Sequence, residues 1–157
     1  MDALLAQVFT GISAGAVLLL IALGLTLTFG QMGVINMAHG EFIMAGAYTA
    51  YVVSTIVAST ELSLLIALPV GFVIGGLLGL ALEASVLRWM YARPLDTLLV
   101  TYGVGLILQQ VARDIFGAPA KEVPAPSWLD GSIPILGYDF PLTRLFIIVL
   151  AAACVAA

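Results

Sequence analysis

Charged residues are scarce in this chain of 157 residues, which has five Lys or Arg and nine Asp or Glu. The formal net charge is −4, so the chain lacks the basic surface that binds nucleic acid, and no nucleic-acid partner is expected. Residues 3–40 contain no Asp, Glu, Lys or Arg. The chain is 62% hydrophobic with a mean hydropathy of +1.18, which soluble domains do not show. The composition therefore predicts an all-α, polytopic transmembrane bundle in a lipid bilayer.

Cysteine and histidine each occur once, as Cys154 and His39. A single cysteine forms no disulfide within the chain, and a single histidine leaves too few ligands for a metal site. His39 and Glu41 form His-x-Glu, but the Pro-Cys-x-x-Cys that a zinc deaminase also needs is missing. The phosphate-binding loop Gly-x-x-x-x-Gly-Lys and the serine-hydrolase motif Gly-x-Ser-x-Gly are also missing. We therefore expect no metal, no cofactor and no catalytic residue.

Apolar segments of helical length follow one another along the chain. Roughly 20 apolar residues cross a bilayer, and most of these segments approach or exceed that length. The last segment is short and is still apolar where the sequence stops, so we expect 1–157 to be a single transmembrane domain truncated within its fifth hydrophobic segment. The segments are 4–30, 42–58, 62–87, 96–112 and 142–157.

The stretch 31–42 holds the polar side chains Asn36, His39 and Glu41 between two long apolar segments. Polar groups are costly in lipid and usually face a cavity or a neighbouring helix. One interpretation places these three residues along a substrate pathway, on a broken or re-entrant segment near residues 31–41. The other makes them a structural junction, with Asn36 and Glu41 as helix caps and His39 packed in the bundle.

Segment 62–87 has small residues at every fourth position, followed by a carboxylate. Glycines at this spacing allow close contact between helix backbones, so Gly71, Gly75 and Gly79 predict helix packing. Glu83 follows on the same face. It is expected either to pair with Arg88 or Arg93 near the membrane surface or to act in gating.

Segment 96–112 has a second stripe, of polar and small residues, and Asp96 is its expected N-cap. The stripe consists of Thr97, Thr101, Gly105, Gln109 and Arg113. Hydroxyl and amide groups on one face suit a polar passage, which assigns Thr101 and Gln109 to the substrate pathway. The same groups equally suit interhelical hydrogen bonds that hold the bundle together.

The loops set the orientation in the membrane. The connection 88–93 has two arginines and no acid, so the positive-inside rule places it in the cytoplasm. Residues 113–142 then form an extracytoplasmic loop, and 59–61 lies on the same side. Within that loop, residues 133–141 suggest a short turn or hairpin. The side of the N-terminus stays open, because it depends on whether residues 31–41 are broken or re-entrant.

The motifs themselves resemble a known family. GLTLTFG at 24–30 and GVINMAHGEF at 33–42 resemble the signature of ABC importer permeases of the branched-chain amino acid type. More narrowly, NMAHGEFIM at 36–44, RPLDTLL at 93–99 and GLILQQ at 105–110 resemble the urea-importer permease of that group. The resemblance extends over essentially the whole chain, and such permeases are about twice as long.

The resemblance implies a permease subunit of the cell inner membrane that is not itself an enzyme. It implies a second permease subunit, two cytoplasmic ATPase subunits that hydrolyse ATP, and an extracytoplasmic solute-binding protein. The coupling segment that meets the ATPases is expected beyond residue 157.

The substrate interpretation begins from the polar faces, which carry mainly amide and hydroxyl groups. These groups match the donors and the carbonyl of urea, so urea or a related amide is the first expectation. A branched-chain amino acid is the alternative within the same family. Outside it, we consider a proton-coupled channel or secondary transporter with His39 and Glu41 as the relay, and a membrane scaffold without transport activity.

Overall fold

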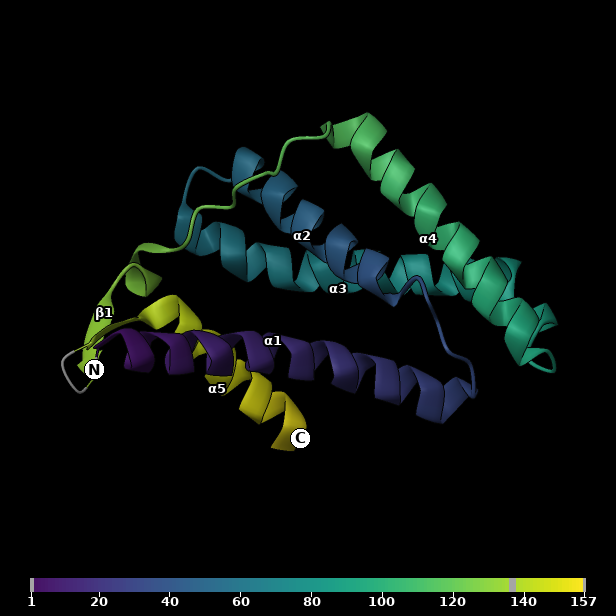
Figure 1. The fold of residues 1–157 in the computed structure, drawn as a ribbon. Helices are drawn as coiled ribbons and strands as arrows, with labels where there is room; N and C mark the ends of the chain where they lie inside the picture. Colours follow the sequence, from purple (N-terminus) through teal and green to yellow (C-terminus); the bar gives the residue numbers. More distant parts are fainter. Residues whose placement is uncertain (1, 136–137, 157) are drawn as a thin grey trace. The chain divides into compact units, whose positions relative to one another are not determined.

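The computed structural model describes residues 2–135 and 138–156, and helices dominate it (Figure 1). The all-α class predicted from composition is confirmed, with one two-stranded sheet in addition. The helices are α1 Asp2–Met32, α2 His39–Ile56, α3 Thr60–Ser85, α4 Pro94–Phe116 and α5 Leu142–Ala156. The shorter elements are the 3-10 turns η1 Leu87–Trp89 and η2 Ser127–Leu129 and the strands β1 Ser132–Ile135 and β2 Tyr138–Pro141.

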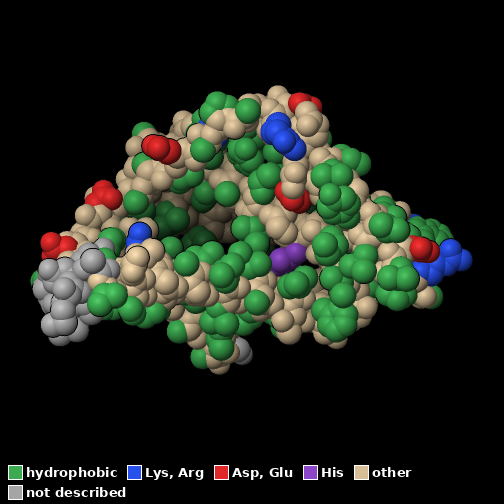
Figure 2. Space-filling view, viewed as in Figure 1, with side chains coloured by type: hydrophobic (Ala, Val, Ile, Leu, Met, Phe, Trp, Pro, Cys, Tyr) green, Lys and Arg blue, Asp and Glu red, His purple; other side chains and the backbone are tan. Residues whose placement is uncertain are grey.

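Three of the described helical stretches are long and apolar enough to cross a membrane, namely Ala6–Met32, Thr60–Trp89 and Pro94–Phe116. Large hydrophobic side chains stand exposed on these helices, with Phe72 84% and Leu99 72% accessible. Hydrophobic side chains also cover much of the face shown in Figure 2, where charged ones are few. Such surfaces suit lipid, and the helices satisfy their own backbone groups. The prediction of a polytopic membrane protein is therefore confirmed.

The chain forms two compact units, residues 25–124 and residues 1–24 together with 125–157. In the first unit, α2 and α3 lie side by side and are joined by residues 57–59 (Figure 1). Ser59 caps α3, because its hydroxyl oxygen accepts a hydrogen bond from the Leu62 N–H at 3.4 Å. The short connection makes the two helices antiparallel neighbours, so the start of α2 lies beside the end of α3.

A small core closes that end of the unit. Val34, Leu82 and Leu87 are buried there, from the α1–α2 connection, α3 and η1 respectively. Partly buried Met32, Phe42 and Val104 pack against them. This cluster brings the connection between α1 and α2 next to the helices that follow.

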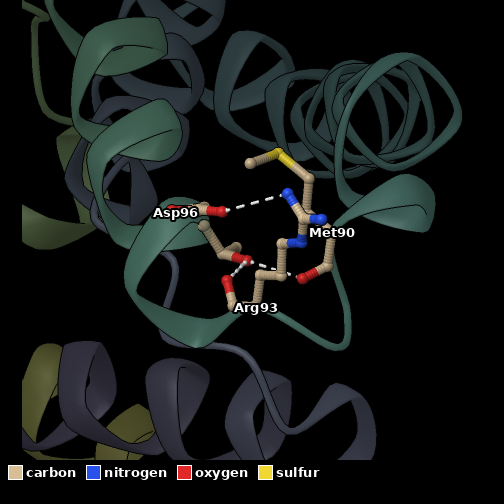
Figure 3. A network of polar contacts seen from close by, with 4 residues as sticks. Met90, Arg93 and Asp96 are labelled. Carbon is tan, nitrogen blue, oxygen red and sulfur yellow. Dashed lines mark hydrogen bonds and ion pairs between the residues drawn. The ribbon is translucent and has the colours of Figure 1, made fainter.

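The turn into α4 is closed by the hydroxyl of Thr97 (Figure 3). Its Oγ1 lies 3.1 Å from the Met90 carbonyl and 2.9 Å from the Arg93 carbonyl. Arg93 is the N-cap and Pro94 opens the helix, as proline commonly does. The prediction that Asp96 is the N-cap is therefore wrong. Asp96 lies in the first turn of α4, where its negative charge interacts favourably with the helix dipole. Its carboxylate also lies 3.7 Å from the Arg93 guanidinium.

Glu83 is paired differently from the sequence expectation. Its Oε1 accepts a 3.2 Å hydrogen bond from the hydroxyl of Tyr91, so the expected pairing with an arginine is wrong. Arg93 lies against Asp96 instead, and the Arg88 guanidinium lies 4.7 Å from the centre of the Trp89 ring. Desolvation, the charge of Glu83 and this hydrogen bond raise the pKa of the Tyr91 phenol above its usual value. The phenol therefore keeps its proton at neutral pH.

The second unit holds the sheet. β1 and β2 pair antiparallel, which confirms the hairpin suggested for residues 133–141, while its turn at 136–137 lies outside the described residues. Phe140 is 2% exposed, and its ring centre lies 4.9 Å from that of Phe9. The first turn of α5 is held by the Leu142 N–H, which donates to the Gly131 carbonyl at 2.9 Å. The connection between α4 and α5 is shorter than predicted, because α4 continues to Phe116.

Candidate functional site

The helical backbone breaks between α1 and α2. Gly33 ends α1 with a φ of 66°, a left-handed conformation that glycine adopts readily, and its N–H donates to the Phe29 carbonyl at 2.8 Å. Residues 33–38 are not helical, and α2 begins at His39. The break expected near residues 31–41 is therefore present in the fold.

Asn36 is buried in this connection and forms hydrogen bonds with its backbone. Its side chain is 8% exposed, and its Oδ1 accepts a 3.0 Å hydrogen bond from the Ala38 N–H. Its backbone carbonyl accepts a further bond from the His39 N–H at 3.2 Å. An asparagine that bonds the backbone two residues ahead forms a turn of its own. Asn36 thus orders the entry into α2, although the N-cap itself is Ala38, which makes no side-chain capping bond.

Thr101 ties the connection to α4. The Met37 N–H donates to Oγ1 of Thr101 at 3.1 Å, while the same hydroxyl donates towards the Thr97 carbonyl at 2.8 Å. Thr101 is fully buried at 0% exposure. It lies seven residues beyond Pro94, or about 10 Å along α4 at the usual helical rise. A non-helical backbone N–H at that depth needs such a partner, because lipid offers none.

Gly105 lies one turn further along the same face of α4. A Cβ at Gly105 would lie 3.7 Å from the Cα of Ala38 and 3.6 Å from the Cγ of Glu41. Ala38 is 0% exposed, so the start of α2 rests directly on this glycine. The small residue in the stripe therefore marks the place where the two backbones approach.

Gln109 and Glu41 meet one turn beyond that contact. Nε2 of Gln109 donates to Oε1 of Glu41 at 2.6 Å, and both side chains are half-buried. Gln109 lies 15 residues after Pro94, about 22 Å along α4. Among the residues that the structure describes, no cation pairs with Glu41. A carboxylate at this depth, bonded to one amide and left without a counter-charge, is an uncommon arrangement in a membrane protein.

His39 stands apart from these contacts. It is half-buried, and within the described part of the chain its ring makes no hydrogen bond. The structure therefore brings Glu41 and Gln109 together and joins Thr101 to the connection that Asn36 shapes, while His39 takes no part in these hydrogen bonds within the described residues.

No described side chain or backbone packs tightly against the glycine stripe of α3. A Cβ added at Gly71, Gly75 or Gly79 would meet no described atom within 4 Å. Close helix packing at these positions stays a prediction, and its partner would be a helix other than those described.

The contacts show how the polar groups are used. The amide and hydroxyl groups of Asn36, Thr101 and Gln109 all bond within the chain. This agrees with the alternative in which the polar stripe of α4 forms hydrogen bonds that hold the bundle together. Sequence reasoning missed the Met37 N–H and Ala38 as the partners of that stripe. No signal in the sequence identifies them, because the four-residue spacing of the stripe describes one helix face and not the residues that lie opposite it.

A cavity of about 450 Å³ opens between α2, α3 and α4. Glu41 lies at the end formed by the first turns of α2, and Glu41 is the only charged residue among the described residues that line the cavity. Near the other end, Tyr48 of α2 stacks on Phe116 of α4 with ring centres 4.2 Å apart. The other lining residues are apolar except Thr49, whose hydroxyl donates to the Ala45 carbonyl at 2.7 Å, and they include Val52, Val70, Ile74, Leu108 and Ile115.

Known proteins are similar to this chain over most of its length. The family described as "Branched-chain amino acid transport system / permease component" matches residues 7–157. The high-affinity branched-chain amino acid transport system permease protein BraD of Pseudomonas aeruginosa is 30% identical over 134 residues, covering 82% of this chain and 43% of the relative. The permease proteins LivH of Salmonella typhimurium and Escherichia coli K12 are each 29% identical over 139 residues, covering 81% of this chain and 42% of each relative.

The chain spans less than half the length of these relatives. No solved structure matches it significantly.

Proposed function

The chain belongs to the family of permease components of branched-chain amino acid transport systems, and from this premise we propose that it forms part of the membrane pathway of an ATP-driven importer of branched-chain amino acids. It is a multi-pass protein of the cell's inner membrane. The observation that carries the proposal is the family match over residues 7–157, which includes the broken segment and the α4 stripe.

The substrate proposal differs from the first expectation drawn from the sequence. The amide and hydroxyl groups on the helix faces favoured urea. In the structure, however, the Thr101 hydroxyl and the Gln109 amide form hydrogen bonds between α4 and residues 37–41. The named relatives are permeases of branched-chain amino acid systems. The first observation removes the argument for urea and the second supports the amino acid alternative, so urea is kept as the competing outcome of the test.

The broken segment suits a pathway. In many transporters, substrate sites lie where helices are discontinuous, because the helix ends and freed backbone groups there can meet a polar solute. Residues 33–38 form such a discontinuity, and Asn36 and Glu41 lie on either side of the start of α2. We assign Asn36, His39, Glu41, Thr101 and Gln109 to the border of the pathway, with Thr101 and Gln109 holding the segment in place.

The proposed assembly contains further subunits. A second permease subunit would complete the pathway, two cytoplasmic ATPase subunits would hydrolyse ATP, and an extracytoplasmic binding protein would deliver the solute. The proposed orientation has residues 88–93 in the cytoplasm and the connection between α4 and α5 outside, with residues 1–157 as one transmembrane domain.

Radiolabelled uptake tests the substrate. Cells without their own leucine and urea uptake systems would express the full-length permease with its partner subunits. We expect leucine to accumulate, excess valine and isoleucine to compete, and excess urea to have no effect. Accumulation of urea without accumulation of leucine would contradict the proposal.

A further inference from the structure

The cavity between α2, α3 and α4 joins an apolar space to one carboxylate. Its volume of about 450 Å³ lies within the range of roughly 300–1,000 Å³ that is usual for small-molecule sites. Met44 and Ala45 lie three and four residues beyond Glu41, so they share its helix face and line the same end of the cavity. Leu108 faces that end from α4.

Glu41 is held in one orientation. The 2.6 Å bond from Gln109 occupies Oε1, and no other hydrogen bond to the Glu41 carboxylate occurs within the described residues. An ionised carboxylate at membrane depth is stable only beside a donor or a cation. The cavity thus presents, at the end of an apolar space, a carboxylate acceptor that no described cation neutralises.

We propose that this end of the cavity receives the apolar side chain of an α-amino acid while the Glu41 carboxylate binds its α-ammonium group. Glu41 is then a substrate-binding residue, Gln109 is its positioning residue, and Ala45 with Leu108 sets the size of side chain accepted. The inference rests on the proposed function and deepens it, because it assigns the substrate's charged and apolar parts to named residues.

Charge complementarity selects this occupant over others. A lipid chain or an apolar helix would fill the space and leave Glu41 without a cation. Urea is neutral and has no apolar part to place against Met44 and Leu108. A zwitterion with a branched aliphatic side chain supplies both the ammonium group and the apolar surface.

The first test changes the charge without removing the internal hydrogen bond. Glu41→Gln keeps a carbonyl oxygen that accepts from Gln109 but lacks the negative charge. In the full-length permease with its partner subunits, we expect leucine uptake to fall about tenfold or more at normal complex abundance. Uptake within twofold of the wild type would overturn the role of Glu41.

The second test changes the size of the cavity. Ala45→Leu fills the end next to Glu41, and the control Ala47→Leu makes the same change at an exposed position of the same helix. We expect Ala45→Leu to lower the ratio of leucine uptake to alanine uptake about tenfold, and Ala47→Leu to leave it unchanged. Equal ratios in the two variants would overturn the assignment of the cavity.

A third variant keeps the test decisive if Ala45→Leu fails to assemble. Leu108→Ala enlarges the cavity, with Leu106→Ala at an exposed position of α4 as its control. We expect Leu108→Ala alone to admit phenylalanine as a competitor of leucine. If Ala45→Leu fails to assemble and phenylalanine does not compete with leucine in Leu108→Ala, the cavity is occupied by another helix and not by substrate. Absence of leucine uptake in the wild type would instead remove the proposed function itself.

Discussion

Nε2 of Gln109 donates a 2.6 Å hydrogen bond to Oε1 of Glu41, and this bond joins α4 to α2 across 68 residues of sequence. The bond from the Met37 N–H to Thr101 makes a second attachment two turns earlier on α4. Between them, Ala38 rests on Gly105. Residues 37–41, which join the interruption to the start of α2, are therefore fixed to one face of α4 at three successive turns.

Loss of the Gln109 amide should destabilise the permease. Gln109→Leu leaves a half-buried carboxylate without its donor, which costs about 1.5–3 kcal/mol for a bond to a charged group. Gln110→Leu is the matched control, because Gln110 is exposed and bonds only Asp114 of the same helix among the described residues. We expect thermal unfolding in detergent to show a clear loss of stability for Gln109→Leu and a change of at most about 0.5 kcal/mol for Gln110→Leu. Equal melting temperatures for the two variants would show that this bond contributes little.

Thr101→Val should loosen the connection between α1 and α2. Valine keeps the shape of threonine but cannot accept the bond from the Met37 N–H, which would then be unsatisfied at membrane depth. Faster hydrogen exchange in peptides that cover residues 33–38 is the expected result, measured by mass spectrometry.

The control for this exchange experiment is Thr55→Val. Thr55 is exposed on α2, and its hydroxyl bonds only the Val52 carbonyl among the described residues. Its substitution should leave exchange at residues 33–38 unchanged. If Thr101→Val also leaves this exchange unchanged, other contacts hold the segment.

Composition and spacing predicted much of this fold. The near absence of charge in residues 3–40 and the apolar lengths identified the membrane helices, and the polar interruption at 31–42 marked the break. The four-residue spacing of Thr97, Thr101, Gly105 and Gln109 identified one helix face, because side chains four apart share a face. The residues that pack against that face could not be predicted, because periodicity identifies a face of one helix but does not show how two helices align with each other.

Errors at the helix ends have a local cause. Asp96 was expected to cap α4 because aspartate is a common N-cap, yet Pro94 fits the first helical position, so the N-cap is Arg93, three residues earlier. Glu83 was expected to pair with an arginine because opposite charges lay nearby in sequence. The turn at η1 instead presents the Tyr91 hydroxyl to Glu83, and such a turn geometry cannot be inferred from charge alone.

Labelling from the two sides of the membrane tests the proposed orientation. Cysteines at Ala92 and Ala120, both exposed positions, would be placed in a background without Cys154. We expect an impermeant maleimide to reach Ala120→Cys in intact cells and Ala92→Cys only after the membrane is opened, because the two arginines favour the cytoplasm. Labelling of both positions from the same side would contradict the orientation.

The glycine stripe of α3 should matter for assembly more than for the fold of this chain. No described atom lies within 4 Å of a Cβ at Gly75 or at its neighbour Gly76, so leucine fits at either position within the chain. The leucine side chain in Gly75→Leu would hold apart two helix backbones that meet at the stripe, whereas the side chain in Gly76→Leu would point away from the stripe. We expect co-purification of the partner subunits to be lost for Gly75→Leu and retained for Gly76→Leu. Full assembly of both variants would show that the stripe faces lipid.

Reconstitution separates ATP-driven import from the proton-coupled alternative. That alternative needs His39 and Glu41 as a relay, but the His39 ring makes no hydrogen bond to Glu41 in the described residues. The most direct measurement is leucine uptake into proteoliposomes that contain the full-length permease and its partner subunits, with either ATP or a proton gradient supplied. We predict uptake that requires ATP and the ATPase subunits and that persists when the proton gradient is collapsed. Uptake driven by the gradient in vesicles that lack the ATPase subunits would contradict the account.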